Sequence, residues 1–112
     1  MGRSNTTIKE YEREIISILL TESGIQNVEI PATQEEIQID QTGVGYFLTF
    51  ASEKLPTERT VLDKPNISGH LGGTHVGFLA FVENAMFTLE CHTYEDSISP
   101  EDREREYKAE SW

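Results

Sequence analysis

The fold is decided by His75-Val-Gly-Phe-Leu-Ala-Phe-Val82 and, after Glu83-Asn84-Ala85, by Met86-Phe-Thr-Leu-Glu-Cys-His-Thr-Tyr94. Both runs are rich in the β-branched and aromatic residues that strands favour, and a short break separates them. We therefore predict a β-hairpin that turns on Asn84 and Ala85. In this register one face is apolar, and its facing pairs are Val82 with Phe87, Ala80 with Leu89, and Phe78 with Cys91. That face is expected to lie in the core.

The opposite face of the hairpin gathers polar side chains together with a few apolar ones. Its members are His75, Leu79, Phe81, Thr88, Glu90, His92 and Tyr94. Histidine and glutamate side chains such as His75, Glu90 and His92 can ligate a metal or carry out general acid-base chemistry. A half-exposed polar sheet face is the alternative interpretation, because a third strong ligand is absent and a register slip of one residue would scatter the set.

A helix is predicted over residues 7–23, ahead of the strands. Its apolar positions follow a 3.6-residue period, and they are Ile8, Tyr11, Ile15, Ile18 and Leu19. Thr7 and Glu10 have the spacing of a capping box, and Gly24 supplies a left-handed stop. The helix should therefore pack one face on a sheet.

Alternation of apolar and polar residues predicts further strands after the helix. They cover residues 27–30, 36–39 and 46–52. A turn at 31–35 joins the first two, and the third is apolar on both faces, so it should lie near the middle of the sheet. Residues 52–74 hold Pro56, Pro65 and three glycines, and only 60–62 resemble a short strand. This segment is expected to be a long, partly irregular connection and a candidate contact surface.

The tail from Ser99 to Asp102 contains a cap residue, a proline at the first helical position and two acids, which is typical of a helix start. Beyond it, a polar helix, a short edge strand and a frayed tail all fit the sequence. We expect residues 1–112 to form a single α+β domain, in which an N-terminal helix packs on a mainly antiparallel sheet of five or six strands.

Charge restricts the class of partner. The 112 residues include 20 acidic and 9 basic side chains, which gives a formal net charge of -11 at pH 7. Such a charge repels nucleic acid phosphates and anionic lipid, and it attracts basic surfaces. We expect a basic protein partner, no direct nucleic acid binding and no membrane association. Acidity that serves only solubility is the alternative.

Catalytic and cofactor motifs are absent from the sequence, so we expect a protein that is not an enzyme and needs no cofactor. The glycine-rich stretch Gly69-His-Leu-Gly-Gly73 lacks the Lys-Ser or Lys-Thr ending of a phosphate loop. The single cysteine, Cys91, cannot form an internal disulfide, and with three histidines it makes too poor a set for a structural zinc site. A reducing compartment fits, and without a secretory signal or a run of about 20 apolar residues we expect a cytoplasmic location.

Exposed aromatic side chains ringed by polar groups are typical of protein-binding surfaces. Tyr94 and Trp112 are the candidates for such an anchor. The residues that we predict to bind the partner are Asp63, Glu90, His92, Tyr94, Glu95 and Asp96.

One segment resembles a known family. Residues 77–94, Gly-Phe-Leu-Ala-Phe-Val-Glu-Asn-Ala-Met-Phe-Thr-Leu-Glu-Cys-His-Thr-Tyr, followed by Ile98-Ser-Pro-Glu-Asp-Arg103, resemble the final hairpin of small acidic immunity proteins from bacterial polymorphic toxin systems. The distinctive part is the Glu-Asn turn that leads into Thr-Leu-Glu-Cys-His. The resemblance implies a cytoplasmic protein that neutralises the basic toxin domain of its own operon, often a nuclease, by covering its active site. It transfers no individual binding residue.

Two other functions stay open at this point. One is a small enzyme or metal-binding protein that uses His75, Glu90 and His92. The other is a nucleic acid mimic that occupies a DNA-binding protein, which requires the acids to form a regular stripe in the fold.

Overall fold

The computed structural model describes residues 7–31, 37–95, 97–98 and 100–111. These residues form one α-helix, α1 (Glu10–Glu22), one 3-10 helix, η2 (Pro100–Glu104), and a six-stranded sheet. The strands are β1 (Gln38–Gln41), β2 (Gly45–Ala51), β3 (Thr60–Leu71), β4 (Thr74–Glu83), β5 (Met86–Thr93) and β6 (Tyr107–Ser111). The predicted α+β class, with an N-terminal helix on an antiparallel sheet, is confirmed.

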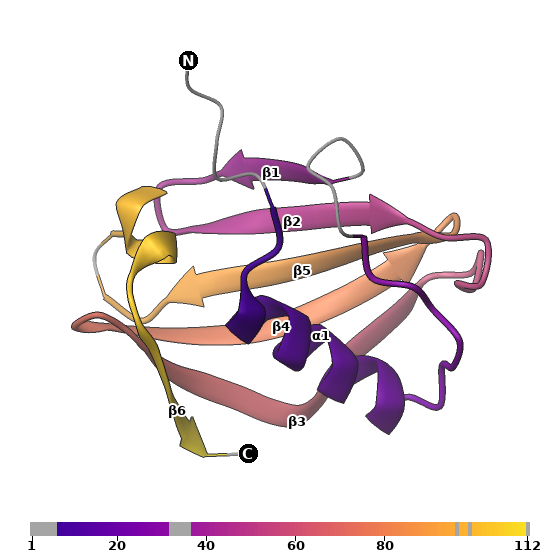
Figure 1. Cartoon of the computed structure of the whole chain (residues 1–112), viewed down its shortest axis with the longest axis horizontal. Coiled ribbons are helices and arrows are strands. Elements are labelled where there is room, and N and C mark those ends of the chain that lie inside the picture. The colour runs from indigo at the N-terminus through magenta and orange to yellow at the C-terminus, as the bar shows by residue number, and fades with distance from the viewer. Residues whose placement is uncertain (1–6, 32–36, 96, 99, 112) are drawn as a thin grey trace.

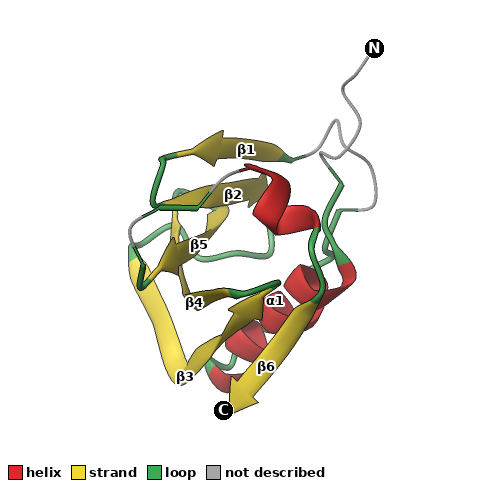
Figure 2. Cartoon of the chain, turned by 90° about the vertical axis from the view of Figure 1, so that its left-hand side faces the viewer, coloured by secondary structure: helices red, strands yellow, loops and turns green. Residues whose placement is uncertain are grey.

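The sheet has the order β1-β2-β5-β4-β3-β6, and every neighbouring pair is antiparallel. It curls so that one face encloses the core, and α1 lies across that face over β3 and β4 (Figures 1 and 2). β2, which was predicted at 46–52 near the middle of the sheet, lies second from the β1 edge. No described helix covers the outer face of the sheet, so its side chains face solvent.

The hairpin of β4 and β5 has the register that the sequence predicts. Val82 pairs with Phe87, Ala80 with Leu89 and Phe78 with Cys91, and all six side chains are buried. Asn84 and Ala85 form the turn with φ angles of 56° and 61°. Two consecutive positive φ angles match the right-handed twist of the flanking strands, which explains why the chain reverses in two residues.

The helix begins three residues later than predicted. Lys9 is the N-cap residue, and its backbone N–H donates to Glu12 Oε1 at 2.8 Å. The predicted capping box of Thr7 and Glu10 is therefore wrong, because Glu12 occupies the position that reaches back to the cap. Gly24 has a φ of 76°, which confirms the predicted left-handed stop.

Residues 27–30 do not form the predicted strand. Val28 and Ile30 are half-buried and pack against the core, while the Arg13 guanidinium donates to the carbonyl oxygens of Ile30 at 3.3 Å and Pro31 at 2.8 Å. A side chain of α1 thus satisfies backbone acceptors that a neighbouring strand would otherwise bind. Most of the predicted turn at 31–35 lies outside the described residues.

The expected irregular connection at 52–74 is also wrong for most of its length, because β3 fills residues 60–71. Pro65 lies in an irregularity of the ladder between Leu62 and Ile67, where a strand tolerates a residue without an N–H. Gly69 marks a close approach and not a loop, since a Cβ there would collide with the Lys108 carbonyl oxygen of β6. Pairing on both sides makes β3 an interior strand.

The C-terminal segment forms a short 3-10 helix followed by an edge strand. The predicted helix start near Ser99, itself outside the described residues, becomes the single 3-10 turn η2. The chain then pairs along β3 as β6, which confirms the edge-strand alternative.

Candidate functional site

All three histidines of the chain lie on the outer face of the sheet at one end of the strands. His70 comes from β3, His75 from β4 and His92 from β5, and Tyr94 follows β5 directly. The His70 and His75 rings stack at 4.8 Å between centroids, the His75 and Tyr94 rings lie 4.6 Å apart, and the His92 ring meets Tyr94 edge-on at 5.2 Å. We call these four residues the histidine-tyrosine row.

Tyr94 is positioned by Gly77 in the sheet as well as by the neighbouring rings of His75 and His92. Its hydroxyl lies directly above Gly77 of β4, where a Cβ would collide with the hydroxyl and would lie 2.9 Å from His92 Nε2. The absence of a side chain at Gly77 therefore creates the space that the ring occupies. Tyr94 is nevertheless 55% exposed, so an aromatic surface faces solvent beside the histidines.

Carboxylates surround the row. Glu110 of β6 accepts a hydrogen bond from Ser68 Oγ at 3.0 Å, and its Oε1 lies 3.0 Å from His75 Nε2. The hydrogen bond from Ser68, followed by that with His75, lowers the pKa of Glu110. Glu95 Oε2 accepts from the backbone N–H of His75 at 3.0 Å, and Glu90 pairs with Leu79 on the outer face. Three carboxylates thus lie around the row, together with one ammonium group, because Lys108 of β6 pairs with His70.

Most of the predicted partner-binding residues fall in or beside this row. Glu90, His92, Tyr94 and Glu95 are brought together, as strand alternation predicts. Asp63 is exposed, but it lies in the β3 irregularity, seven residues before His70. At ~3.3 Å per residue along a strand, Asp63 is roughly 20 Å from His70. Asp96 and Trp112 lie outside the described residues.

The structure separates the groups that the metal-binding alternative needs. Tyr94 contacts both His75 and His92, and no direct ring contact between these histidines is among the described ones. Within the described ranges, no three His, Cys, Asp or Glu side chains are arranged to hold a metal ion. Cys91 is buried on the core face, and burial raises the pKa of its thiol, which disfavours the nucleophilic thiolate.

Two members of the site were not predicted from the sequence. His70 and Glu110 come from β3 and β6, and their place depends on the pairing of these strands with each other and with β4. The local signal was weak, because His70 stands among glycines and Glu110 stands in a polar tail.

A buried polar cluster on the core side was also missed. The Arg103 guanidinium of η2 donates to Glu12 of α1 through Nε at 2.6 Å and Nη2 at 2.7 Å, and Nη2 also donates to the Thr7 carbonyl oxygen at 2.6 Å. The Tyr46 hydroxyl donates to Glu12 Oε2, and burial followed by the Glu12 charge raises the pKa of Tyr46. This cluster anchors η2, and with it the start of the segment that carries Glu110.

Comparison of the chain with protein-family models, curated proteins and solved structures found no match. In the part of the chain that the structure describes, no helix has both the length and the apolar character needed to cross a membrane.

Proposed function

We propose that this chain is a stoichiometric binding protein for a basic protein partner, in the manner of an immunity protein that neutralises a toxin domain. The observation that supports this function is the histidine-tyrosine row, on a sheet face that no described helix covers. Tyrosine is enriched among the residues that contribute most to protein binding, especially where polar groups surround it. Here Glu90, Glu95 and Glu110 supply a rim that can pair with lysine and arginine.

Binding would proceed in two steps. The net charge of -11 attracts a basic surface and speeds its approach. Tyr94 then packs against the partner, where a cation over its ring adds a favourable contact. Because the histidines and Gly77 already orient the ring, little side-chain freedom is lost on binding.

The same charge argues for a protein partner over a polyanion or an anionic membrane. A toxin that acts on nucleic acid needs a basic active-site surface, so an acidic face is suited to cover it. We place the protein in the cytoplasm as part of this proposal, since such a toxin acts there and the Cys91 thiol is unpaired.

The decisive experiment uses the protein encoded by the gene next to that of this chain. Its expression alone should arrest growth, and co-expression of the chain should restore growth and yield a one-to-one complex by light scattering. Tyr94→Ala should abolish rescue. The matched control is Val61→Ala, which also truncates an exposed apolar side chain. Val61 is 52% exposed and lies on β3, with the strand's irregularity between it and His70 of the row. A neighbouring protein that is not toxic, or not bound, overturns the function. Rescue that survives Tyr94→Ala overturns the site.

A further inference from the structure

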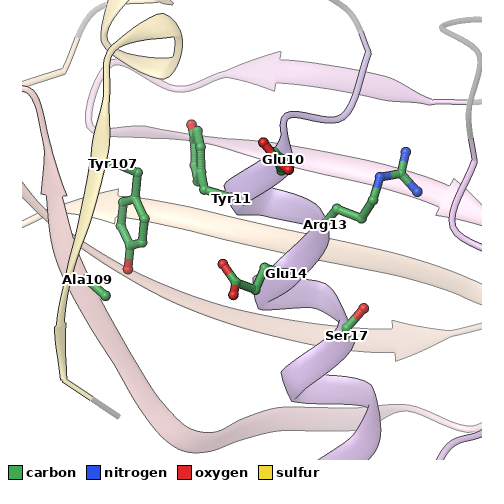
Figure 3. A pocket seen from close by; sticks show the side chains of 7 residues that line it. All are labelled: Glu10, Tyr11, Arg13, Glu14, Ser17, Tyr107 and Ala109. Atoms are coloured by element: carbon green, nitrogen blue, oxygen red, sulfur yellow. The ribbon is translucent and has the colours of Figure 1, made fainter.

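A second surface lies on the helix side of the molecule. A groove with a cavity volume of about 720 Å³ runs between α1 and β6, and Tyr107 and Ala109 line it from the strand (Figure 3). Helix residues line the other side. This size falls in the range of sites that hold small ligands. The histidine-tyrosine row lies on the outer face, so the two surfaces are separate.

One wall of the groove is aromatic and rigid. The Tyr107 ring stacks on the Tyr11 ring at 5.1 Å with an interplanar angle of 21°, and it meets Phe78 edge-on at 5.7 Å. The Tyr11 hydroxyl donates to the Arg103 carbonyl oxygen at 2.9 Å, and the Tyr107 hydroxyl donates to the Ser68 carbonyl oxygen at 3.3 Å. Both rings are thereby fixed before any ligand arrives.

The facing wall is acidic. Glu10 and Glu14 stand one helical turn apart and are both exposed, and neither forms an ion pair with a described residue. Figure 3 shows the Glu14 side chain pointing from α1 towards Tyr107. Burial, with smaller contributions that include the Glu14 charge, raises the pKa of Tyr107 to about 12. The Tyr107 ring of the aromatic wall therefore lies close enough to the Glu14 carboxylate to interact with its charge.

No described cation of the lining neutralises these acids. Arg13 is the one basic residue among the described lining residues, and its guanidinium donates to the carbonyl oxygens of Ile30 and Pro31. Its side chain points away from β6 (Figure 3). A groove with two carboxylates on one side and a tyrosine ring on the other is complementary to an organic cation.

We propose that this groove receives an arginine side chain of the basic partner, so the inference rests on the function proposed above. The guanidinium would pair with Glu14 and Glu10 while its plane lies against Tyr107. Arginine fits better than lysine because its planar group can stack on a ring and donate to two carboxylates at once. The partner would then contact the chain at two places, on opposite faces of the sheet.

The test uses short peptide amides as probes and needs no toxin. A peptide with one central arginine is titrated into the full chain labelled with ¹⁵N, beside the same peptide with citrulline, which is neutral but similar in shape. We expect the arginine peptide to shift amide signals of residues 10–17 and 107–109, and the citrulline peptide to leave them unchanged. Glu14→Gln should weaken binding about tenfold, through the loss of a charge-assisted hydrogen bond.

Glu22→Gln is the matched control, because it removes an exposed acid at the far end of the same helix. Equal binding by wild type and Glu14→Gln, or shifts confined to residues 90–95, would overturn the groove as an arginine site. Both substitutions are at exposed positions, so the fold should be retained, and thermal unfolding checks this. If the peptide test fails, the arginine site is wrong but growth rescue that depends on Tyr94 still supports the proposed function. If growth rescue fails, the proposed function is wrong but the measured peptide binding is unaffected.

Discussion

Arg103 and Glu12 are 91 residues apart in the chain and form a buried, bidentate ion pair. Their side chains are 3% and 0% exposed. Among the described residues, every buried side-chain nitrogen or oxygen atom has a hydrogen-bond partner, and this pair is the centre of a cluster that includes the Tyr46 hydroxyl and the Thr7 carbonyl oxygen. It joins the start of α1 to η2, and thereby sets where β6 begins.

Removing one partner of this pair should strongly destabilise the fold. Arg103→Met leaves the Glu12 carboxylate buried without its counter-charge, and we expect a loss of about 3–5 kcal/mol in the free energy of unfolding. Urea denaturation measures it. Arg105→Met, which removes a guanidinium that is 58% exposed, is the control and should change the free energy by less than about 1 kcal/mol. Equal effects of the two substitutions would contradict the role of the buried pair.

Alkaline pH should unfold the protein as its tyrosines ionise. The pKa of Tyr107 is raised from 10.0 to about 12, mainly by burial, and the pKa values of Tyr11 and Tyr46 are raised further by the same cause. A folded-state pKa above the unfolded value means that the stability is complete below pH 10 and is lost as the pH rises towards 12 and beyond.

Tyrosinate absorbance and circular dichroism, followed together, check this expectation. The buried tyrosines should ionise only as the β-sheet signal disappears. Tyr107→Phe should make stability less dependent on pH between 10 and 12. Ionisation of all four tyrosines with the sheet signal unchanged would show that the buried hydroxyls are accessible, contrary to their burial.

Gly77→Ala should displace Tyr94 without unfolding the sheet. The new Cβ would occupy the space of the Tyr94 hydroxyl, and an exposed ring can rotate away at a cost of about 1 kcal/mol or less. The imidazole proton signals of His75 and His92 should then move, because they lose the ring current of Tyr94. Gly73→Ala is the control, since nothing lies within 4 Å of a Cβ there. Unchanged imidazole signals in Gly77→Ala would contradict the described position of Tyr94.

Glu110 should titrate below the ordinary range of glutamate. The hydrogen bonds from Ser68 and with His75 favour its charged form, so the stability they add is present above the ordinary pKa and disappears as the pH falls through the lowered one. Carboxyl ¹³C shifts measure this pKa. Ser68→Ala should move it back towards the ordinary value, while Ser17→Ala, an exposed serine on α1, should not.

Association with the basic partner should depend strongly on salt. Screening shortens the reach of surface charge from about 30 Å at 0.01 M to about 8 Å at 0.15 M ionic strength. We expect the association rate to fall about tenfold or more over this range, with a much smaller change in the dissociation rate. Stopped-flow measurements with the neighbouring-gene protein test this. An association rate that is indifferent to salt would rule out electrostatic steering.

How far the sequence predicts each element depends on the range of the interactions that form it. The β4-β5 hairpin was predictable because the alternation of apolar and polar residues and the two-residue turn both lie within 20 consecutive residues, 75–94. β3 was not, since Pro65 and Gly69 are typical of loops, and the strand forms because β4 and β6 pair with it on both sides. The strand expected at 27–30 fails for the opposite reason, because its alternation has no neighbouring strand to pair with among the described residues.

The candidate site follows the same division. Glu90 and His92 share a face because they alternate along β5, and Tyr94, directly after the strand, continues the alternation, which the sequence shows directly. His70 and Glu110 join them only when the sheet brings β3 and β6 alongside β4. Asp63 is an acid of the predicted contact segment 52–74, most of which is β3, and it lies away from the row on that strand.

The sequence by itself determined the acidic charge, the helix with its Gly24 stop and the register of the hairpin, because each depends on composition or on residues a few positions apart. Only the tertiary structure decided that Glu12 meets Arg103, that His70 stacks on His75 while His75 contacts Tyr94, and that Glu14 faces Tyr107 across a groove. Glu12 does stand on the buried stripe of α1, four residues after Ile8 and four before Ile16, but no period in the chain says which cation will reach it.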